Sequence, residues 1–340
     1  MPTLYINGKN TEARLDDRRS VVSWLDGKQD DVATVEAPLH DLDRVVIVGK
    51  PSVSMAAIHS FVRNGIPVYL ISRSGRWLGS LMPNKNGNAL RRLHQYEAAN
   101  DEALALSIAK KLVFAKIRNM RRVLQRLAAN RKQSEEPAQM DACNSLLKMQ
   151  HSLVAAEGLE AVRGYEGVST AIYFGRLGTF FPPTLPFVSR SKRPPLDGAN
   201  ALLSWTYTIV LAEIDAEIRC AGLDPCLGFL HNISTGRASL ACDLLEPLRA
   251  PLCDLLVLNL LNHGLIKVQN FHREDEDGGI YLNDDAKGCF FSEYEQYMER
   301  SFAEVKGGNH VTFRHVIKNM VSNVCNALEA KELKDFFLMP

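Results

Sequence analysis

One histidine and two acids stand close together in Gly228–Arg249, which reads GFLHNISTGRASLACDLLEPLR. His231 lies in a polar loop, and Asp243 and Glu246 follow at the start of an apolar segment. Side chains three residues apart on a helix share a face, so both acids can point the same way. An imidazole folded back over two carboxylates gives a mixed nitrogen and oxygen ligand set, which suits a divalent cation.

A third acid, Glu166, stands in a segment of helical periodicity from Leu159 to Phe180, close to Gly164 and Gly167. A glycine inside a helix costs up to about 1 kcal/mol relative to alanine. The two glycines therefore indicate that another backbone or a ligand comes close to the helix here. Such a ligand could then contact Glu166. The alternative is a surface glutamate beside a helix break. Together with the histidine and the two acids above, Glu166 makes a set without thiolates, which suits Mg²⁺ or Mn²⁺ more than zinc or copper.

Two basic segments indicate an anionic partner. Magnesium-type ions held by carboxylates commonly serve phosphoryl transfer, so a basic surface nearby favours a nucleic-acid substrate. In the predicted helix Leu90–Lys132, the stretch from Lys110 to Lys132 holds nine cations and no acid: Lys110, Lys111, Lys116, Arg118, Arg121, Arg122, Arg126, Arg131 and Lys132. They can contact DNA phosphates or pair with acids elsewhere in the fold. The irregular loop Phe181–Pro195, with five prolines and the cations Arg190, Lys192 and Arg193, is either a DNA contact or a solvated, flexible loop.

The composition limits the class of protein. The chain has 340 residues, of which 46% are hydrophobic and 23% are charged, as expected for about two globular domains. The net charge of +1 excludes a global basic field, so a nucleic acid must meet a local patch. Seven cysteines without a CxxC pair indicate buried thiols in a reducing compartment. No signal peptide or membrane-length apolar run is found, which predicts a soluble, cytoplasmic protein without membrane contact.

The order of elements predicts an α+β fold with two domains. Short β-branched runs punctuated by turns indicate a small β-rich, sandwich-like domain over residues 1–88, with one helix over Ser52–Asn64. The polar stretch Asn84–Asn88 marks the boundary. A larger all-α catalytic domain is predicted over residues 89–340, in which Asp197 begins one helix and Pro247 bends another.

Three motifs in this order resemble the CRISPR-associated endonuclease and integrase of spacer acquisition, across essentially the whole chain. They are RGYEGVSTAIYF (Arg163–Phe174), RPPLDGANALLSWTYTIV (Arg193–Val210) and LGFLHNISTGRASLACDLLEPLR (Leu227–Arg249). The resemblance implies an N-terminal β domain that forms the dimer interface and a helical catalytic domain. It also implies a Mg²⁺ or Mn²⁺ ion held by Glu166, His231 and Glu246, with Asp243 in support.

The reaction that the resemblance implies is transesterification, in which the 3′-hydroxyl of a captured DNA fragment attacks a phosphodiester at the border of a CRISPR repeat. Two dimers working with a small nuclease-like partner protein are implied as well. Candidate DNA contacts are the cations of the basic helix, the proline-rich loop and the motifs: Arg118, Arg121, Arg122, Arg163, Lys192, Arg193 and Arg237.

Residue chemistry alone supports only metal-dependent phosphodiester chemistry, so two alternatives stay open. One is a stand-alone nuclease that cuts branched or single-stranded DNA, with water as the nucleophile. The other is a non-catalytic DNA-binding scaffold in which the acids merely pair with cations such as Arg163 and Arg237.

Overall fold

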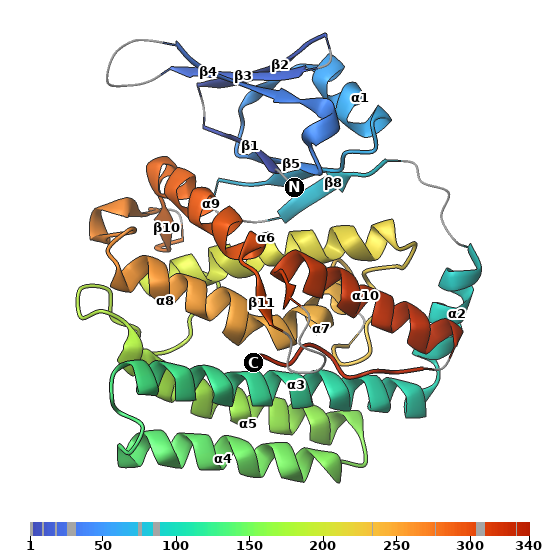
Figure 1. Ribbon diagram of the computed structural model, residues 1–340, viewed down its shortest axis with the longest axis vertical. Coiled ribbons are helices and arrows are strands. Elements are labelled where there is room, and N and C mark those ends of the chain that lie inside the picture. The colour runs from blue at the N-terminus through green and yellow to red at the C-terminus, as the bar shows by residue number, and fades with distance from the viewer. Residues whose placement is uncertain are drawn as a thin grey trace. The chain divides into compact units, whose positions relative to one another are not determined.

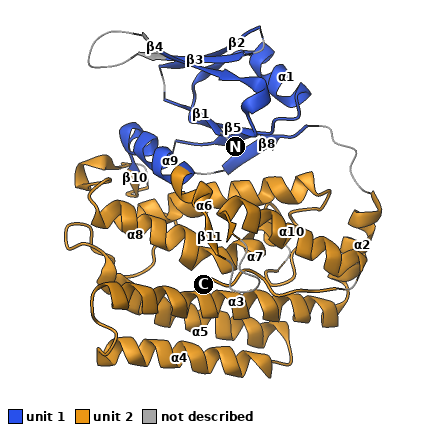
Figure 2. Ribbon diagram, in the orientation of Figure 1, with its two compact units in different colours: residues 1–87, 282–295 blue, residues 88–281, 296–340 orange. Residues whose placement is uncertain are grey.

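The chain forms two compact units (Figure 2). The computed structural model describes residues 3–8, 10–17, 19–25, 32–73, 77–83, 89–232, 234–275, 277–303, 310–330 and 332–340. We call residues 1–87 and 282–295 the β unit, and residues 88–281 and 296–340 the helical unit. The division therefore falls at Gly87 and Asn88, while the turn-rich stretch expected to mark it lies outside the described residues. Residues 282–295, placed in the helical domain from the sequence, cluster with the β unit.

The β unit contains two four-stranded sheets around a common core (Figure 1). One sheet has the order β1 (Thr3–Asn7), β5 (Arg44–Val48), β7 (Val68–Ile71) and β8 (Trp77–Leu81). The other has the order β4 (Val32–Pro38), β3 (Arg19–Leu25), β2 (Thr11–Asp16) and β6 (Ser52–Val53). Every residue of β5 is buried, which explains its continuous apolar run, VVIV. One core cluster joins residues of both sheets to helix α1 (Met55–Arg63), in agreement with a β-rich N-terminal domain.

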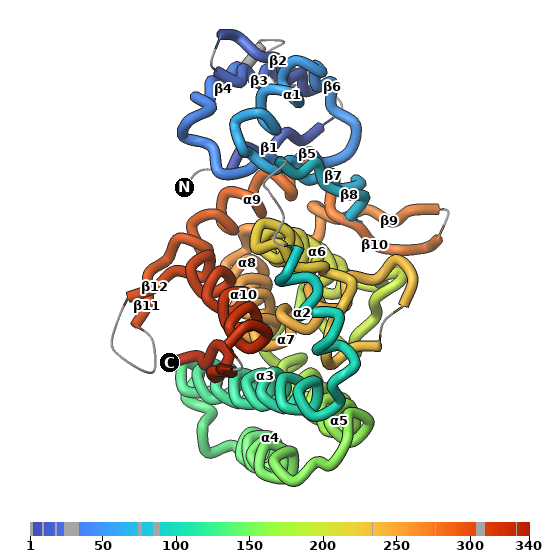
Figure 3. Tube along the Cα trace, turned by 90° about the vertical axis from the view of Figure 1, so that its right-hand side faces the viewer, coloured from blue at the N-terminus to red at the C-terminus, as the bar shows by residue number. Residues whose placement is uncertain are grey.

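The helical unit is built from long helices, and Figures 1 and 3 both place α3 beside α4 and α5. The helices are α2 (Ala89–Ala99), α3 (Glu102–Asn130), α4 (Pro137–Val154), α5 (Leu159–Leu177), α6 (Gly198–Cys220), α7 (Ser239–Leu248), α8 (Leu255–Asn262), α9 (Asp284–Glu299, mostly in the β unit) and α10 (Phe313–Glu329). Asp197 caps α6 through the amide of Asn200, as predicted. Helix α3 packs against both α5 and α7, so it is positioned to link the acids of those helices.

Two expectations for this unit were wrong. The segment Leu90–Lys132 is not one helix, because α2 ends at Ala99 and the Asp101 side chain caps a new helix by accepting a hydrogen bond from the Leu104 amide. The unit is also not entirely helical. Short strands pair in two places: β9 (Phe271–Arg273) with β10 (Ile280–Leu282), and β11 (Phe302–Ala303) with β12 (His310–Val311).

Pro247 lies in the last turn of α7, where the sequence predicted a bend. The backbone does not continue as an α-helix: a π-helical segment, Arg249–Asp254, follows α7 and leads directly into α8. Proline has no N–H to donate to the carbonyl four residues earlier, so the ladder is already interrupted at this point.

Two smaller expectations concern membranes and thiols. Within the described ranges, no helix combines the length and the apolar character that spanning a membrane requires. Of the seven cysteines, only Cys253 and Cys325 are buried, so the prediction of buried thiols holds for those two.

Candidate functional site

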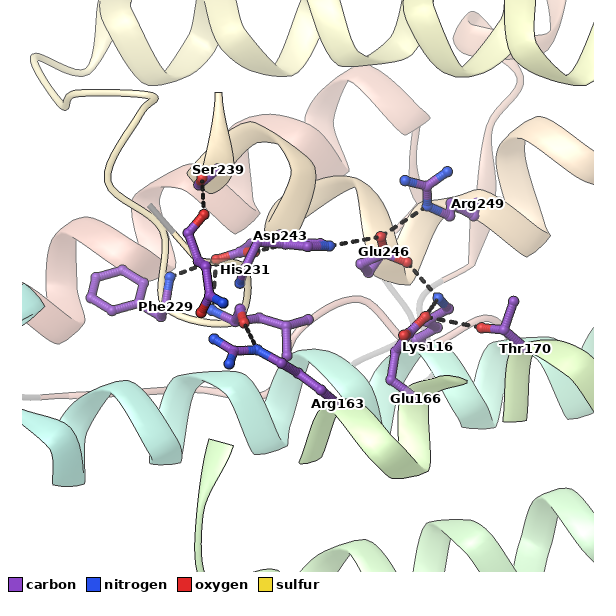
Figure 4. A network of polar contacts seen from close by, with 12 residues as sticks. Lys116, Arg163, Glu166, Thr170, Phe229, His231, Ser239, Asp243, Glu246 and Arg249 are labelled. Carbon is purple, nitrogen blue, oxygen red and sulfur yellow. Dashed lines mark hydrogen bonds and ion pairs between the residues drawn. The ribbon is translucent and has the colours of Figure 1, made fainter. Parts of the chain in front are cut away.

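Two acids from different helices meet at one lysine (Figure 4). Glu166 comes from α5, Glu246 from α7 and Lys116 from α3. The ammonium of Lys116 pairs with Oε1 of Glu166, and its Nζ lies 2.6 Å from Oε2 of Glu246. The side chains of Lys116 and Glu246 are 3% and 4% exposed, whereas that of Glu166 is 27% exposed. Glu166 therefore forms the solvent-accessible side of this cluster.

Glu246 keeps its charge although it is buried. Burial alone would raise the pKa of its carboxyl, but the positive charges of Arg249 and Lys116 outweigh burial and lower the pKa to about 2. Nε of Arg249 lies 3.0 Å from Oε1 of Glu246, and the Arg249 guanidinium stacks over the ring of Tyr207 at 4.6 Å. Glu246 is thus an ionised carboxylate with a cation on each oxygen.

Asp243 fixes the loop that carries the histidine. This carboxylate is fully buried and accepts hydrogen bonds from the amides of Phe229, Leu230 and His231, at 2.6, 2.9 and 3.0 Å. Its Oδ1 also lies 2.6 Å from Nδ1 of His231. A carboxylate accepts, so Nδ1 carries the proton of the neutral ring and the electron pair is on Nε2. Nε2 faces Oε1 of Glu246 at 3.9 Å, too far for a hydrogen bond.

Two further residues shape the same loop. A Cβ added at Gly228 would lie 2.6 Å from Oδ2 of Asp243 and 2.8 Å from the main chain of Ser239, so only glycine fits there. Arg163, on α5, donates from Nε to the carbonyl oxygen of Leu230 at 2.7 Å and pairs with Glu160. Arg163 therefore braces the histidine loop, and its contact with DNA stays a prediction.

The donor types suit a hard divalent cation. Glu166 and Glu246 already converge on one positive charge, and the free electron pair of His231 faces the second of these carboxylates. In the part of the chain that the structure describes, no three His, Cys, Asp or Glu side chains are grouped closely enough to hold an ion by themselves. The cation shared by the two glutamates is the ammonium of Lys116. The residues therefore fit a metal ion if Lys116 withdraws.

The two glycines beside Glu166 lie on an open face of α5. A Cβ added at Gly164 or Gly167 meets no heavy atom within 4 Å, so no backbone of the described chain approaches them. The helix also runs unbroken from Leu159 to Leu177, which excludes the alternative of a helix break. Space for a ligand and a simple position on the solvent-exposed face both stay open for Gly164 and Gly167.

Five cations of the basic helix donate hydrogen bonds to main-chain oxygens. Lys110 donates to Val154, Lys111 to Leu333, Arg118 to Met339, Arg122 to Pro340, and Arg131 to Thr179 and Phe180. Lys111 also pairs with Asp335, and Lys116 binds the two site glutamates. Contact of Arg118 and Arg122 with DNA stays a prediction, as it does for the half-buried Arg121 and the exposed Lys192, Arg193 and Arg237.

Three residues of the site were missed from the sequence: Lys116, Thr170 and Arg249. Lys116 was counted among the basic residues, although it follows the buried Leu112 by four positions and so falls on the apolar stripe of α3. The other two could have been found by helical spacing. Thr170 donates to Oε1 of Glu166, four residues before it, and Arg249 pairs with Glu246, three residues before it.

Comparison with known proteins identifies the family. The model of the family described as CRISPR associated protein Cas1 matches residues 4–296. The chain is 34% identical over 302 residues to the CRISPR-associated endonuclease Cas1 1 of Thermodesulfovibrio yellowstonii. The aligned region covers 88% of this chain and 92% of the relative.

Solved structures share the fold. A casposase bound to an integration product matches 100% of this chain and 94% of its own, with a TM-score of 0.87 at 24% identity. A chain of a Cas6-RT-Cas1–Cas2 complex matches 99% of this chain and 36% of its own, with a TM-score of 0.79 at 27% identity. The family match over most of the chain agrees with the resemblance of the three motifs, and the protein belongs to the Cas1 family of CRISPR-associated proteins.

Proposed function

We propose that this chain is a metal-dependent DNA endonuclease and integrase that inserts captured DNA fragments into a CRISPR array. The observation that carries the proposal is the convergence of Glu166 and Glu246, from two helices, on one cation beside the free nitrogen of His231 (Figure 4). Membership of the Cas1 family supports it, because relatives are named CRISPR-associated endonucleases.

In this proposal, Glu166, His231 and Glu246 hold Mg²⁺ or Mn²⁺, which polarises the phosphate and stabilises the attacking and leaving oxygens. Asp243 keeps the His231 ring turned with Nε2 toward Glu246, and Arg249 keeps the Glu246 carboxylate oriented and ionised. The 3′-hydroxyl of the captured fragment attacks a phosphodiester at the border of the repeat. One P–O bond forms as another breaks, so the number of phosphodiesters is unchanged.

The proposed partners are DNA, a second copy of the chain and a small nuclease-like protein. A structural relative at 27% identity is part of a complex named for both Cas1 and Cas2, which supports the small partner. We assign the dimer contact to the β unit on the basis of the resemblance, and we place the reaction in the cytoplasm.

The test combines the purified protein and its small partner with a short duplex bearing free 3′ ends and a plasmid bearing a repeat. Reactions contain Mn²⁺, Mg²⁺ or chelator. Covalent joining that requires metal supports the integrase. Cleavage without joining would indicate a stand-alone nuclease, and no reaction with intact DNA binding would indicate a scaffold.

Glu166→Ala should reduce joining at least about 100-fold, the scale expected when a group that stabilises the transition state is removed. Glu157→Ala, which removes an exposed glutamate two residues before the same helix begins, is the matched control and should leave joining unchanged. Circular dichroism of both variants checks the fold. Full activity of a folded Glu166→Ala protein would remove the proposed metal site.

A further inference from the structure

The position between the two site carboxylates belongs to the chain's own Lys116. Its side chain is 3% exposed, and its ammonium is paired with Glu166 on one side and with Glu246 on the other. Lysine is rarely buried unless it is paired, because an unpaired ammonium loses its hydration without compensation. The buried ammonium of Lys116 therefore needs the two carboxylates as counter-ions, and the two carboxylates need the ammonium to balance their charge.

The four charges that meet around Lys116 already balance: Glu166 and Glu246 contribute two negative charges, and Lys116 and Arg249 contribute two positive charges. A divalent cation added to this set would bring in two further positive charges, of which the buried Asp243 carboxylate behind His231 could offset only one. Leaving a positive charge uncompensated in a largely buried place is unfavourable. A metal ion can bind both glutamates at lower cost if the ammonium leaves.

The lysine can leave without unfolding its helix. Its charge is carried on a flexible four-carbon stem, whereas Arg249 is held by Glu246 and by stacking on Tyr207. The Glu166 side chain is 27% exposed, so solvent already reaches the cluster beside this residue. Of the two cations in the cluster, Lys116 is thus the one that can be exchanged.

We propose that Lys116 is a positioning residue that acts as a built-in counter-ion: it holds Glu166 and Glu246 together in the metal-free protein and competes with the metal ion for them. This inference rests on the proposed metal site. It makes metal affinity a property of α3, a helix that contributes no ligand, and it predicts that removing the ammonium strengthens metal binding.

The direct test is Lys116→Met, which keeps the aliphatic stem and removes the charge. The variant is titrated with Mn²⁺ alone, and free Mn²⁺ is measured by electron paramagnetic resonance. The variant should bind Mn²⁺ at least about tenfold more tightly than the unaltered chain does. In chelator, the variant should melt at a lower temperature, because two carboxylates lose their counter-ion. Saturating Mn²⁺ should then raise its melting temperature by more than it raises that of the unaltered chain.

Lys111→Met is the matched control. Lys111 lies on the same helix and also pairs with an acid, Asp335, but it makes no contact with the glutamates of the site. Its loss should leave Mn²⁺ affinity unchanged. If Lys116→Met binds Mn²⁺ no more tightly than the unaltered chain does, the inference is wrong, and Lys116 only stabilises the fold through its ion pairs.

A second measurement uses the unaltered chain, so it does not depend on whether the variant folds. An amine-reactive reagent should modify Lys116 severalfold faster in Mn²⁺ than in chelator, while Lys111 should react equally in both, as read by mass spectrometry. Protection of Lys116 that persists in saturating Mn²⁺ would contradict the exchange.

The two proposals can fail separately. If the unaltered chain binds no Mn²⁺ that depends on Glu166, the metal site fails and this inference fails with it. If it binds Mn²⁺ but Lys116→Met binds no more tightly, the metal site stands and only the role of Lys116 is rejected.

Discussion

Glu246, near the end of α7, and Asp254, the last residue of the π-helical segment that follows, are two buried acids whose pKa values are shifted in opposite directions. Glu246 is 4% exposed and Asp254 is fully buried. The pKa of Glu246 is lowered to about 2, whereas burial raises the pKa of Asp254 to about 6. Burial is common to both, so it cannot explain the difference.

The difference lies in their neighbours. Glu246 contacts two full positive charges, on Lys116 and Arg249. Asp254 instead accepts hydrogen bonds from the hydroxyls of Tyr207, at 2.5 Å, and Tyr173, at 2.9 Å. These hydroxyls, together with the positive charges of Arg249 and Arg190, only partly offset burial. An acid that must stay charged to hold a metal therefore needs cations in direct contact with its carboxylate, as Glu246 has.

The largest expected effect is that of Glu246→Ala. It leaves Lys116 and Arg249 partly or wholly uncompensated, and breaking a buried ion pair from one side costs about 3–5 kcal/mol. Urea unfolding in chelator at pH 7.5 measures the loss. Glu166→Ala is the comparison, because Lys116 keeps Glu246 in that variant, so its loss should be clearly smaller. If both variants lose the same free energy of unfolding, Glu246 contributes no more to the stability of the cluster than Glu166 does.

Asp254→Asn tests the second buried acid through pH. The folded-state pKa of Asp254 is raised from 3.8 to about 6, so its contribution to stability is fully present below pH 3.8 and is lost as the pH rises through 6. A shift of about two units corresponds to roughly 3 kcal/mol. The free energy of unfolding of the unaltered chain, relative to Asp254→Asn, should therefore fall by about that amount between pH 4 and 7.5. A flat difference would mean that Asp254 titrates normally.

The smallest expected effect separates the two tyrosines. Removing one hydroxyl that donates to a buried carboxylate costs about 1.5–3 kcal/mol. Tyr207→Phe should lie toward the upper end of that range at pH 7.5 and Tyr173→Phe toward the lower end, since the Tyr207 contact is shorter. Thermal unfolding of both variants measures the difference. The reverse order would show that the shorter of the two contacts is not the stronger one.

Local spacing predicted the part of the site that is local in sequence. The interval between Asp243 and Glu246 placed both on α7, and the structure puts both in the cluster around His231. Lys116 could not be assigned in the same way, because its partners are 50 and 130 residues away and periodicity shows only which face of a helix is apolar. Arg249 and Thr170 were missed although spacing alone links them to the glutamates.

Helix boundaries were predicted correctly where the sequence has a residue typical of a helix start or of the turn after a helix. The helix expected over Ser52–Asn64 is found as α1, and Asp197 begins α6 as expected. Gly65 and Gly222 lie at positive φ just after these two helices. Asp101 was overlooked as a cap because basic and apolar residues on both sides kept the helical period. The clustering of residues 282–295 with the β unit depends on contacts between distant parts of the chain, which composition does not report.

The π-helical segment Arg249–Asp254 determines where the chain near the site can lose one residue without turning its helices. A π turn holds one more residue than an α turn, so deleting a single residue there would let α7 run straight into α8. Such a deletion would therefore leave the faces of α7 and α8, and with them Glu246 and Asp254, close to their present directions. Each residue turns an α-helix by roughly 100°, so a deletion inside α7 or α8 would instead rotate the residues on its two sides out of register. Library design around this site should therefore include deletions as well as substitutions.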